Sequence, residues 1–177
     1  MRTDLALTER EGRLLALVVR EQPVTAYQLY KYHERSPTGS INSSKGQVYP
    51  AVERLKRRGL IEGRPTIEDR PNVEELTATD LGVAAVKAWV KSVSPSTVNM
   101  DDPLRTRLLS FGLLTREERL EWVANAKRAV RDVERVFEEY NSLGVPYLDL
   151  AQKNAVVLLR ARMMWLDEVL YEVAAED

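Results

Sequence analysis

The 177-residue sequence contains no cysteine and only one histidine, His33. Without cysteine the chain cannot form disulfide bonds, cysteine-ligated zinc or iron–sulfur sites, or a thiol nucleophile. A single histidine argues against a His-rich metal site and against a catalytic triad. There is also no phosphate-binding glycine loop and no G-x-S-x-G motif. We therefore expect a protein that is not an enzyme and carries no metal or cofactor.

Long apolar segments are missing as well. The longest aliphatic run, Leu14 to Val19, is far shorter than the roughly 20 residues that a membrane helix needs. The first four residues, Met1 to Asp4, contain no apolar region typical of a secretion signal. With 44% hydrophobic and 30% charged residues, the composition is that of an ordinary globular chain. We expect a cytoplasmic protein with no membrane partner.

Charge of one sign is not in excess overall, but it is unevenly distributed. The chain has 26 basic and 27 acidic side chains, yet the segment 43–64 has six basic residues against two acidic ones. A basic stripe on a near-neutral protein can bind a polyanion such as nucleic acid. The same charges are also typical of a solvated helix face, so this alternative stays open.

Helix signals follow one another through the first half of the chain. Capping boxes at Thr8–Glu11, Thr25–Gln28 and Ser44–Gln47 predict three helices, the third ending before Gly59. Pro50 indicates either a kink inside the third helix or its true start. Residues 60–64 and 73–78 predict a two-stranded hairpin, and Thr79 or Asp80 caps a fourth helix. This order is typical of a winged helix-turn-helix, with its basic third helix as the major-groove reader.

The second half predicts a helical domain. Residues 93–102 are polar and lack a period, which is typical of a linker. A short helix from Pro103 and two long helices, from Thr115 to about Asn141 and from Leu148 to Ala174, follow. The last helix has two apolar stripes: Val156, Leu159, Met163, Leu166, Leu170 and Val173 in the first, and Leu158, Trp165 and Val169 in the second. Two stripes exceed what one antiparallel hairpin can bury, which favours a second chain, although packing on the winged-helix domain is the alternative.

The fold prediction is thus mainly α with a small β-hairpin. Residues 1–92 form a winged helix-turn-helix, residues 93–102 a linker and residues 103–177 a helical dimerisation domain. The stripe residues expected at the dimer interface are Leu158, Leu159, Met163, Trp165, Leu166, Val169, Leu170 and Val173.

Residues 44–61 read SKGQVYPAVERLKRRGLI. This segment resembles the PadR family of bacterial transcriptional regulators, whose signature is S-x-G-x-[IV]-Y-P-x-[LV]-x-R-L-x-x-x-G-L-I. Arg70 stands where that family has a wing arginine, and Thr79-x-x-Gly82 matches the opening of its fourth helix. The sequence departs from the family at Leu76 and Ala78, where a Y-x-L is usual. The long C-terminal part resembles the subgroup with a large helical dimerisation domain.

The resemblance implies a set of DNA-contacting residues. Lys45 and Gln47 would reach base edges, since lysine suits guanine and glutamine suits adenine. The remaining implied contacts are Thr25, Tyr27, Ser43, Ser44, Tyr49, Arg54, Arg64 and Arg70. Arg54 has an alternative role as the partner of an internal acid, and Arg57 and Arg58 fit a solvated C-terminal turn.

The expected function is a repressor that binds a palindromic operator in double-stranded DNA as a homodimer. A small hydrophobic or aromatic effector that binds a pocket near Trp122, Trp165 and Tyr171 would release the repressor from DNA. Plain core packing is the alternative explanation for these aromatic residues. The alternative is a winged-helix adaptor that docks a protein partner without binding an operator.

Overall fold

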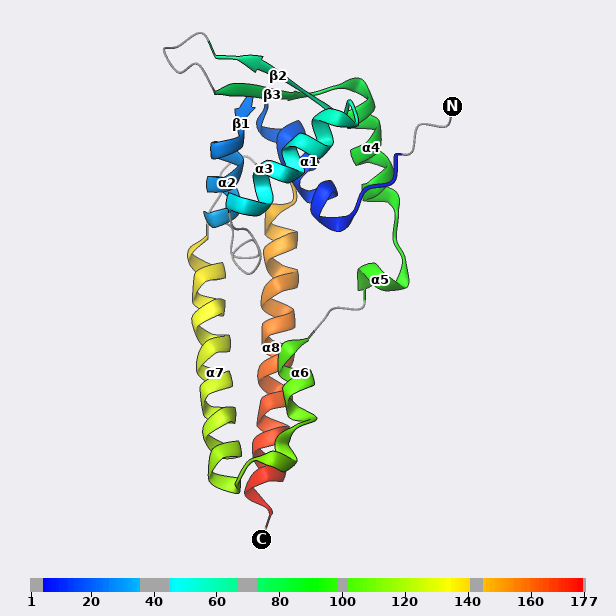
Figure 1. Ribbon diagram of the computed structural model, residues 1–177. Helices are drawn as coiled ribbons and strands as arrows, with labels where there is room; N and C mark the ends of the chain where they lie inside the picture. Colours follow the sequence, from blue (N-terminus) through cyan, green and yellow to red (C-terminus); the bar gives the residue numbers. More distant parts are fainter. Residues whose placement is uncertain (1–4, 36–44, 67–72, 99–101, 141–144, 177) are drawn as a thin grey trace. The chain divides into compact units, whose positions relative to one another are not determined.

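A computed structural model of the chain describes residues 5–35, 45–66, 73–98, 102–140 and 145–176 (Figure 1). The chain forms two compact units, Met1–Asn99 and Met100–Asp177. Their boundary falls inside the segment for which the sequence predicts a linker, but that segment also contains an unpredicted one-turn helix, α5 (Pro95–Val98). Within the described ranges, no helix is both long and apolar enough to span a bilayer.

The first unit has the winged-helix order of elements. Its members are α1 (Glu9–Glu21), β1 (Val24–Thr25), α2 (Ala26–Arg35), α3 (Lys45–Arg57), β2 (Ile61–Pro65), β3 (Glu74–Ala78) and α4 (Asp80–Lys91). The strands form an antiparallel sheet in the order β1-β3-β2. The sequence predicts the hairpin of β2 and β3 but not the third strand, β1. A two-residue strand has no alternating pattern to detect, and β1 is defined by its pairing with β3.

Two of the three predicted capping boxes at the N-terminal helices are confirmed. The Thr8 hydroxyl accepts from the Glu11 amide at 3.3 Å, while the Glu11 carboxylate accepts from the Thr8 amide at 3.2 Å. The same reciprocal pair joins Thr25 and Gln28 at 2.8 and 3.2 Å. The third box depends on Ser44, which lies outside the described residues. These boxes place the starts of α1 and α2 where the sequence predicts them.

Helix α3 resolves the alternatives for Pro50. It begins at Lys45 and continues through Pro50, so the proline lies inside the helix rather than at its start. Gly59 then ends the helical segment with φ +66°, a left-handed backbone conformation that glycine adopts at little cost. The helix thus keeps its register past the proline and presents one continuous apolar face.

That apolar face of α3 forms part of a single core in the first unit. The helical spacing of its apolar residues predicts a stripe of Val48, Ala51, Val52 and Leu55, and all four are buried. Side chains from α1, α2, both long strands and α4 complete the same cluster, including Leu15, Leu29, Leu60, Leu76 and Ala85. The sequence spacing predicts an apolar face of α4 made of Leu81, Ala84, Ala85, Ala88 and Trp89. Ala84 and Ala88 are exposed instead, and Val86 packs against the core.

The junction between α3 and α4 leaves no space at Gly82. The Thr79 hydroxyl accepts from the Gly82 amide at 3.0 Å and donates to the Gly59 carbonyl at 2.7 Å. A Cβ on Gly82 would lie 2.0 Å from the Leu60 carbonyl oxygen. This close approach explains why a glycine follows the cap at this position.

The second unit is built on a helical hairpin. It contains α6 (Pro103–Leu108), a 3₁₀ turn η1 (Phe111–Leu113), α7 (Arg116–Glu139) and α8 (Leu148–Ala174). The last two run antiparallel, with α6 beside α8 (Figure 1). Thr115 and Glu118 form the predicted capping box of α7. Asp102, expected in the linker, instead caps α6 and forms an ion pair with Arg162 at 3.0 Å.

Within the described residues of α7 and α8, the buried side chains form a narrow seam. Its members are Val123, Ala126, Val130, Leu166, Val169 and Val173. Leu166 is 0% exposed, and Val169 and Val173 are also buried. These three residues were expected at the dimer interface. That expectation is corrected here, because contacts within their own chain already cover them.

Candidate DNA interface

The structure describes six of the ten predicted DNA-contacting residues in full. Thr25, Tyr27, Gln47, Tyr49, Arg54 and Arg64 lie on α2, α3 and the two-stranded wing β2–β3 or next to them. Ser43, Ser44 and Arg70 lie outside the described residues, and so does the side chain of Lys45, whose backbone begins α3.

Three of these residues meet at one hollow of the first unit. Thr25, Tyr27 and Tyr49 line a cavity of about 170 Å³ with Val52, Leu76, Glu53 and Glu74. The two tyrosines are 51% and 45% exposed, so part of each side chain faces solvent at this hollow. The fold therefore brings together the start of α2 and the middle of α3, which lie more than twenty residues apart in the sequence.

Gln47 occupies a less accessible position than expected for a base-reading residue. Its side chain is half-buried, and its Oε1 is buried without a hydrogen-bond partner among the described residues. An unsatisfied buried acceptor is costly.

The wing carries an accessible cation. Arg64 on β2 is exposed, pairs in register with Glu75 on β3 and makes no ion pair within the part of the chain that the structure describes. Lys56 at the end of α3 differs: its ammonium group lies 2.5 Å from Glu74 and 3.8 Å from Glu53. The hydrogen bond to Glu74 raises the pKa of Lys56 and keeps its charge engaged within the protein.

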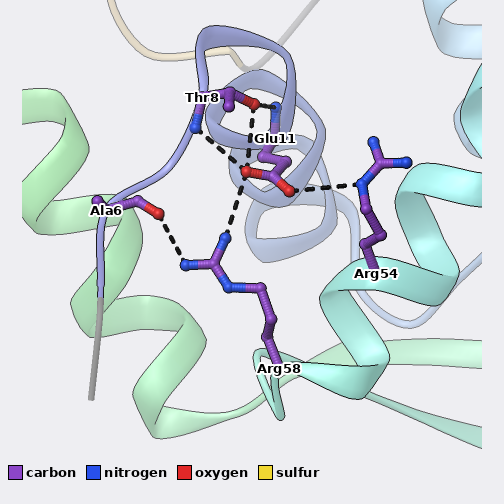
Figure 2. A network of polar contacts seen from close by, with 5 residues as sticks. All are labelled: Ala6, Thr8, Glu11, Arg54 and Arg58. Carbon is purple, nitrogen blue, oxygen red and sulfur yellow. Dashed lines mark hydrogen bonds and ion pairs between the residues drawn. The ribbon is translucent and has the colours of Figure 1, made fainter. Parts of the chain in front are cut away.

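A carboxylate of α1 holds the other two cations on the inner flank of α3 (Figure 2). Glu11 lies 3.6 Å from Arg54 Nε through its Oε1 and 3.2 Å from Arg58 Nη1 through its Oε2. Arg58 also donates to the Ala6 carbonyl at 2.7 Å. Arg54 thus has the internal acid that was its alternative role. Arg58 corrects the expectation of a solvated turn, since it ties α3 to the segment before α1.

The electrostatics of this cluster favour the charged form of Glu11. Burial by itself would raise the pKa of the Glu11 carboxyl, but hydrogen bonds from Thr8 and the two guanidinium groups outweigh it and hold the pKa below its ordinary value. Sequence reasoning found Glu11 only as a capping residue. Nothing in the linear pattern shows that the same carboxylate meets residues 43 and 47 positions further along the chain.

The predicted effector residues separate in the structure. Trp122 belongs to the core, with its ring edge-on to Phe111 at 4.9 Å, which agrees with the core-packing alternative. Trp165 lines a cavity of about 340 Å³ together with Leu108, Phe111, Val169, Val173, Glu168, Glu172 and Glu176. Tyr171 is not among the lining residues and is 74% exposed. The sequence analysis did not select Glu168, Glu172 and Glu176. Their four-residue spacing marks a site only because Leu108 of α6 and Phe111 of η1 line the same cavity.

The first unit, which carries the candidate interface, also matches a known protein family. Residues 14–88, from within α1 to the last turn of α4, match the model of the transcriptional regulator PadR-like family. Residues 14–88 are a PadR-like transcriptional-regulator domain. The matched stretch contains α3, the wing and the Tyr27–Tyr49 hollow, so the candidate interface lies entirely within the PadR-like domain. A comparison with curated protein sequences finds no significant match.

Solved structures show the same fold over nearly the whole chain. Bacillus subtilis PadR in complex with operator DNA aligns with a TM-score of 0.74 and 20% identity, covering 94% of this chain and 99% of that one. The same protein in complex with p-coumaric acid aligns with a TM-score of 0.72 and 16% identity, covering 93% of this chain and 98% of that one. The virulence activator AphA of Vibrio cholerae aligns with a TM-score of 0.67 and 18% identity, with the same two coverages. The winged helix with a helical C-terminal region is thus the PadR fold.

Proposed function

We propose that this protein is a sequence-specific DNA-binding transcriptional regulator, a repressor that binds a palindromic operator as a homodimer in the bacterial cytoplasm. The observation that carries the proposal is the surface of the PadR-like domain, where Tyr27, Tyr49 and Arg64 are exposed beside a helix of the recognition type. Tyrosine hydroxyls and arginine guanidinium groups bind DNA phosphates well. The operator-bound relative supports the same mode of binding here.

The proposed homodimer uses a surface of α8 that the sequence analysis did not select. Leu150, Val157, Met164 and Tyr171 recur every seven residues and are 59%, 52%, 66% and 74% exposed. A heptad-spaced apolar stripe on a long helix is the pattern of a helix–helix seam. From the earlier set, Leu158 remains exposed, while Leu159, Met163, Trp165 and Leu170 are half-buried and could contribute at the edge of this seam.

The effector proposal rests on the Trp165 cavity. Its volume of about 340 Å³ is within the range of small-molecule sites, and its floor is apolar. The p-coumaric acid complex supports the idea of a small effector for a protein of this fold. In this chain, Glu168, Glu172 and Glu176 surround the cavity, so an uncharged aromatic ligand is favoured over a carboxylic acid.

DNA binding can be tested with the sequence upstream of the protein's own gene. Fluorescence anisotropy should show binding that weakens with salt, and a footprint should reveal two half-sites about one helical turn, roughly 34 Å, apart or a multiple of that. Arg64→Ala should weaken operator and random DNA alike and reduce the salt slope by about one unit. Gln47→Ala should instead relax the base preference by about 1–3 kcal/mol at one position per half-site.

A matched control is Arg131→Ala, which removes an exposed arginine from α7 in the other unit and should leave the salt slope unchanged. If binding showed a flat salt dependence and left no footprint, the operator proposal would be wrong and the protein-interaction adaptor would replace it. If Gln47→Ala weakened random and operator DNA equally, Gln47 would contact the backbone and not a base.

A further inference from the structure

The basic segment around α3 contains fewer available cations than its sequence suggests. Lys56 is paired with Glu74 and Glu53, and both Arg54 and Arg58 are paired with Glu11. Within the described residues of this segment, Arg57 and Arg64 are exposed cations with no ion pair. An acid from α1 therefore removes a large share of the positive charge that the recognition segment could offer to DNA.

We propose that Glu11 is a positioning residue that determines DNA specificity: by holding the Arg54 and Arg58 guanidinium groups against α1, it keeps them away from DNA phosphates and limits sequence-independent binding. This inference rests on the proposed function, since it concerns how the same α3 engages DNA. It assigns Glu11 a role beyond that of capping its own helix.

The Glu11 carboxylate is held by its own helix cap as well as by the two arginines (Figure 2). The Thr8 amide and the Thr8 hydroxyl both donate to Glu11 Oε2 at 3.2 Å, so the capping box of α1 sets the orientation of the carboxylate. Glu11 is only 8% exposed, which leaves little room for another rotamer.

Each arginine engages a different carboxylate oxygen. Arg54 Nε approaches Oε1 at 3.6 Å, and Arg58 Nη1 approaches Oε2 at 3.2 Å. Because the Glu11 oxygens are divided between them, neither guanidinium forms the bidentate pair that is the strongest arginine–carboxylate geometry. Arg54 also remains 43% exposed at its side chain. A phosphate could compete for Arg54 if the charge of Glu11 were removed.

The location on α3 makes that competition relevant to DNA. Arg54 stands seven residues after Gln47 and therefore lies on the same flank of the helix, two turns further along. Phosphate contacts carry affinity without sequence information, and each one adds about 0.9 to the slope of log affinity against log salt. Holding Arg54 and Arg58 inward lowers binding to all sequences, so operator recognition depends more on base contacts.

The decisive experiment compares Glu11→Gln with wild type on operator and random-sequence duplexes across a salt series. The glutamine keeps the shape and a hydrogen-bond acceptor for Thr8 but loses the charge. We expect the salt slope to steepen by about one unit per released arginine and the affinity for random DNA to rise roughly three- to tenfold at low salt. The operator affinity should rise less, so the ratio of specific to non-specific binding should fall.

Two further variants separate this role from a loss of structure. The double variant Glu11→Gln with Arg54→Gln should return the slope toward wild type, because the released cation is gone. Asp80→Asn removes the same charge from an exposed position on α4 and should leave the slope unchanged, which controls for net charge. If circular dichroism shows that Glu11→Gln does not fold, the single variant Arg54→Gln is compared with wild type instead. A salt slope of DNA binding equal to that of wild type supports the proposal, and a salt slope reduced by about one unit overturns it.

The outcomes distinguish this inference from the proposed function. If wild type does not bind DNA in a salt-dependent way, the proposed function fails. If wild type prefers its operator but folded Glu11→Gln has the same slope and the same specificity ratio, only the role of Glu11 is overturned.

Discussion

The two units bury their apolar side chains to very different extents. In the first, α1, α2, α3, α4 and the sheet share one cluster of fourteen buried residues. In the second, two clusters of three buried residues each hold α7 and α8 together, while the large side chains of Leu150, Val157, Met164 and Tyr171 stay exposed on α8. A domain with layers on several sides of its core can be stable alone, whereas a helical hairpin has only one seam. The comparison predicts that the second unit needs a partner.

The sharpest test of this difference applies one chemical change to both cores. Leu55 on α3 and Leu166 on α8 are each 0% exposed. We expect Leu55→Ala to cost about 4 kcal/mol of unfolding free energy and Leu166→Ala about 2 kcal/mol, since a hairpin can collapse into the space but a multilayer core cannot. Urea unfolding followed by circular dichroism measures both. Equal costs, or a larger one at Leu166, would show that the second unit is as well packed as the first.

The partner of the second unit can be removed through its exposed stripe. Val157→Asp combined with Met164→Asp places two charges in the proposed seam and should weaken dimerisation by about 3 kcal/mol or more, while the hairpin stays helical. Light scattering at micromolar concentration should find a dimer for wild type and a monomer for the variant. The control Asn125→Asp with Ala129→Asp adds the same charge to exposed positions on α7. A wild-type monomer would contradict the proposed seam.

Among the described residues, Glu11 in the first unit and Asp102 in the second have a lowered carboxyl pKa, which allows a comparison under acid. Burial opposes the shift at Glu11 and at Asp102, but hydrogen bonds and arginines outweigh it at both. A carboxyl whose folded-state pKa is depressed stabilises the protein above its ordinary pKa, about 4, and this stability disappears as the pH falls through the lower folded-state value. Stability measured from pH 6 to pH 2 should therefore fall less steeply in Glu11→Gln and in Asp102→Asn than in wild type. A slope identical to that of wild type would mean that these groups do not contribute.

The smallest expected effect compares one capping box from each unit, that of Thr115 and that of Thr8. Thr115→Ala in the second unit removes the hydroxyl cap of α7 and should cost about 1 kcal/mol. Thr8→Ala should cost somewhat more, up to about 2 kcal/mol, because the Thr8 hydroxyl also donates to the carboxylate that holds Arg58. Thermal unfolding compares the two variants directly. A larger loss at Thr115 would show that the Glu11 cluster adds nothing to the cap.

Local signals predicted most of the elements correctly. The boxes at Thr8, Thr25 and Thr115 mark helix starts because the cap and its partner are three residues apart, and Gly59 marks a helix end because of its backbone freedom. The α3 signature predicted the PadR-like domain for the same reason, since its residues are contiguous. Signals of this kind lie within one turn of helix and do not depend on the rest of the chain.

The errors occurred where a distant segment decides the outcome. Strand β1 depends on β3, the role of Arg58 depends on Glu11, and the exposure of the α8 stripes depends on which one α7 covers. Sequence alone determined the long helices, the caps at Thr8, Thr25 and Thr115 and the basic character of α3, because those follow from neighbouring residues. Only the tertiary structure decided which cations are paired and which apolar stripe remains exposed, because charge pairing and burial arise between residues that the chain separates and the fold brings together.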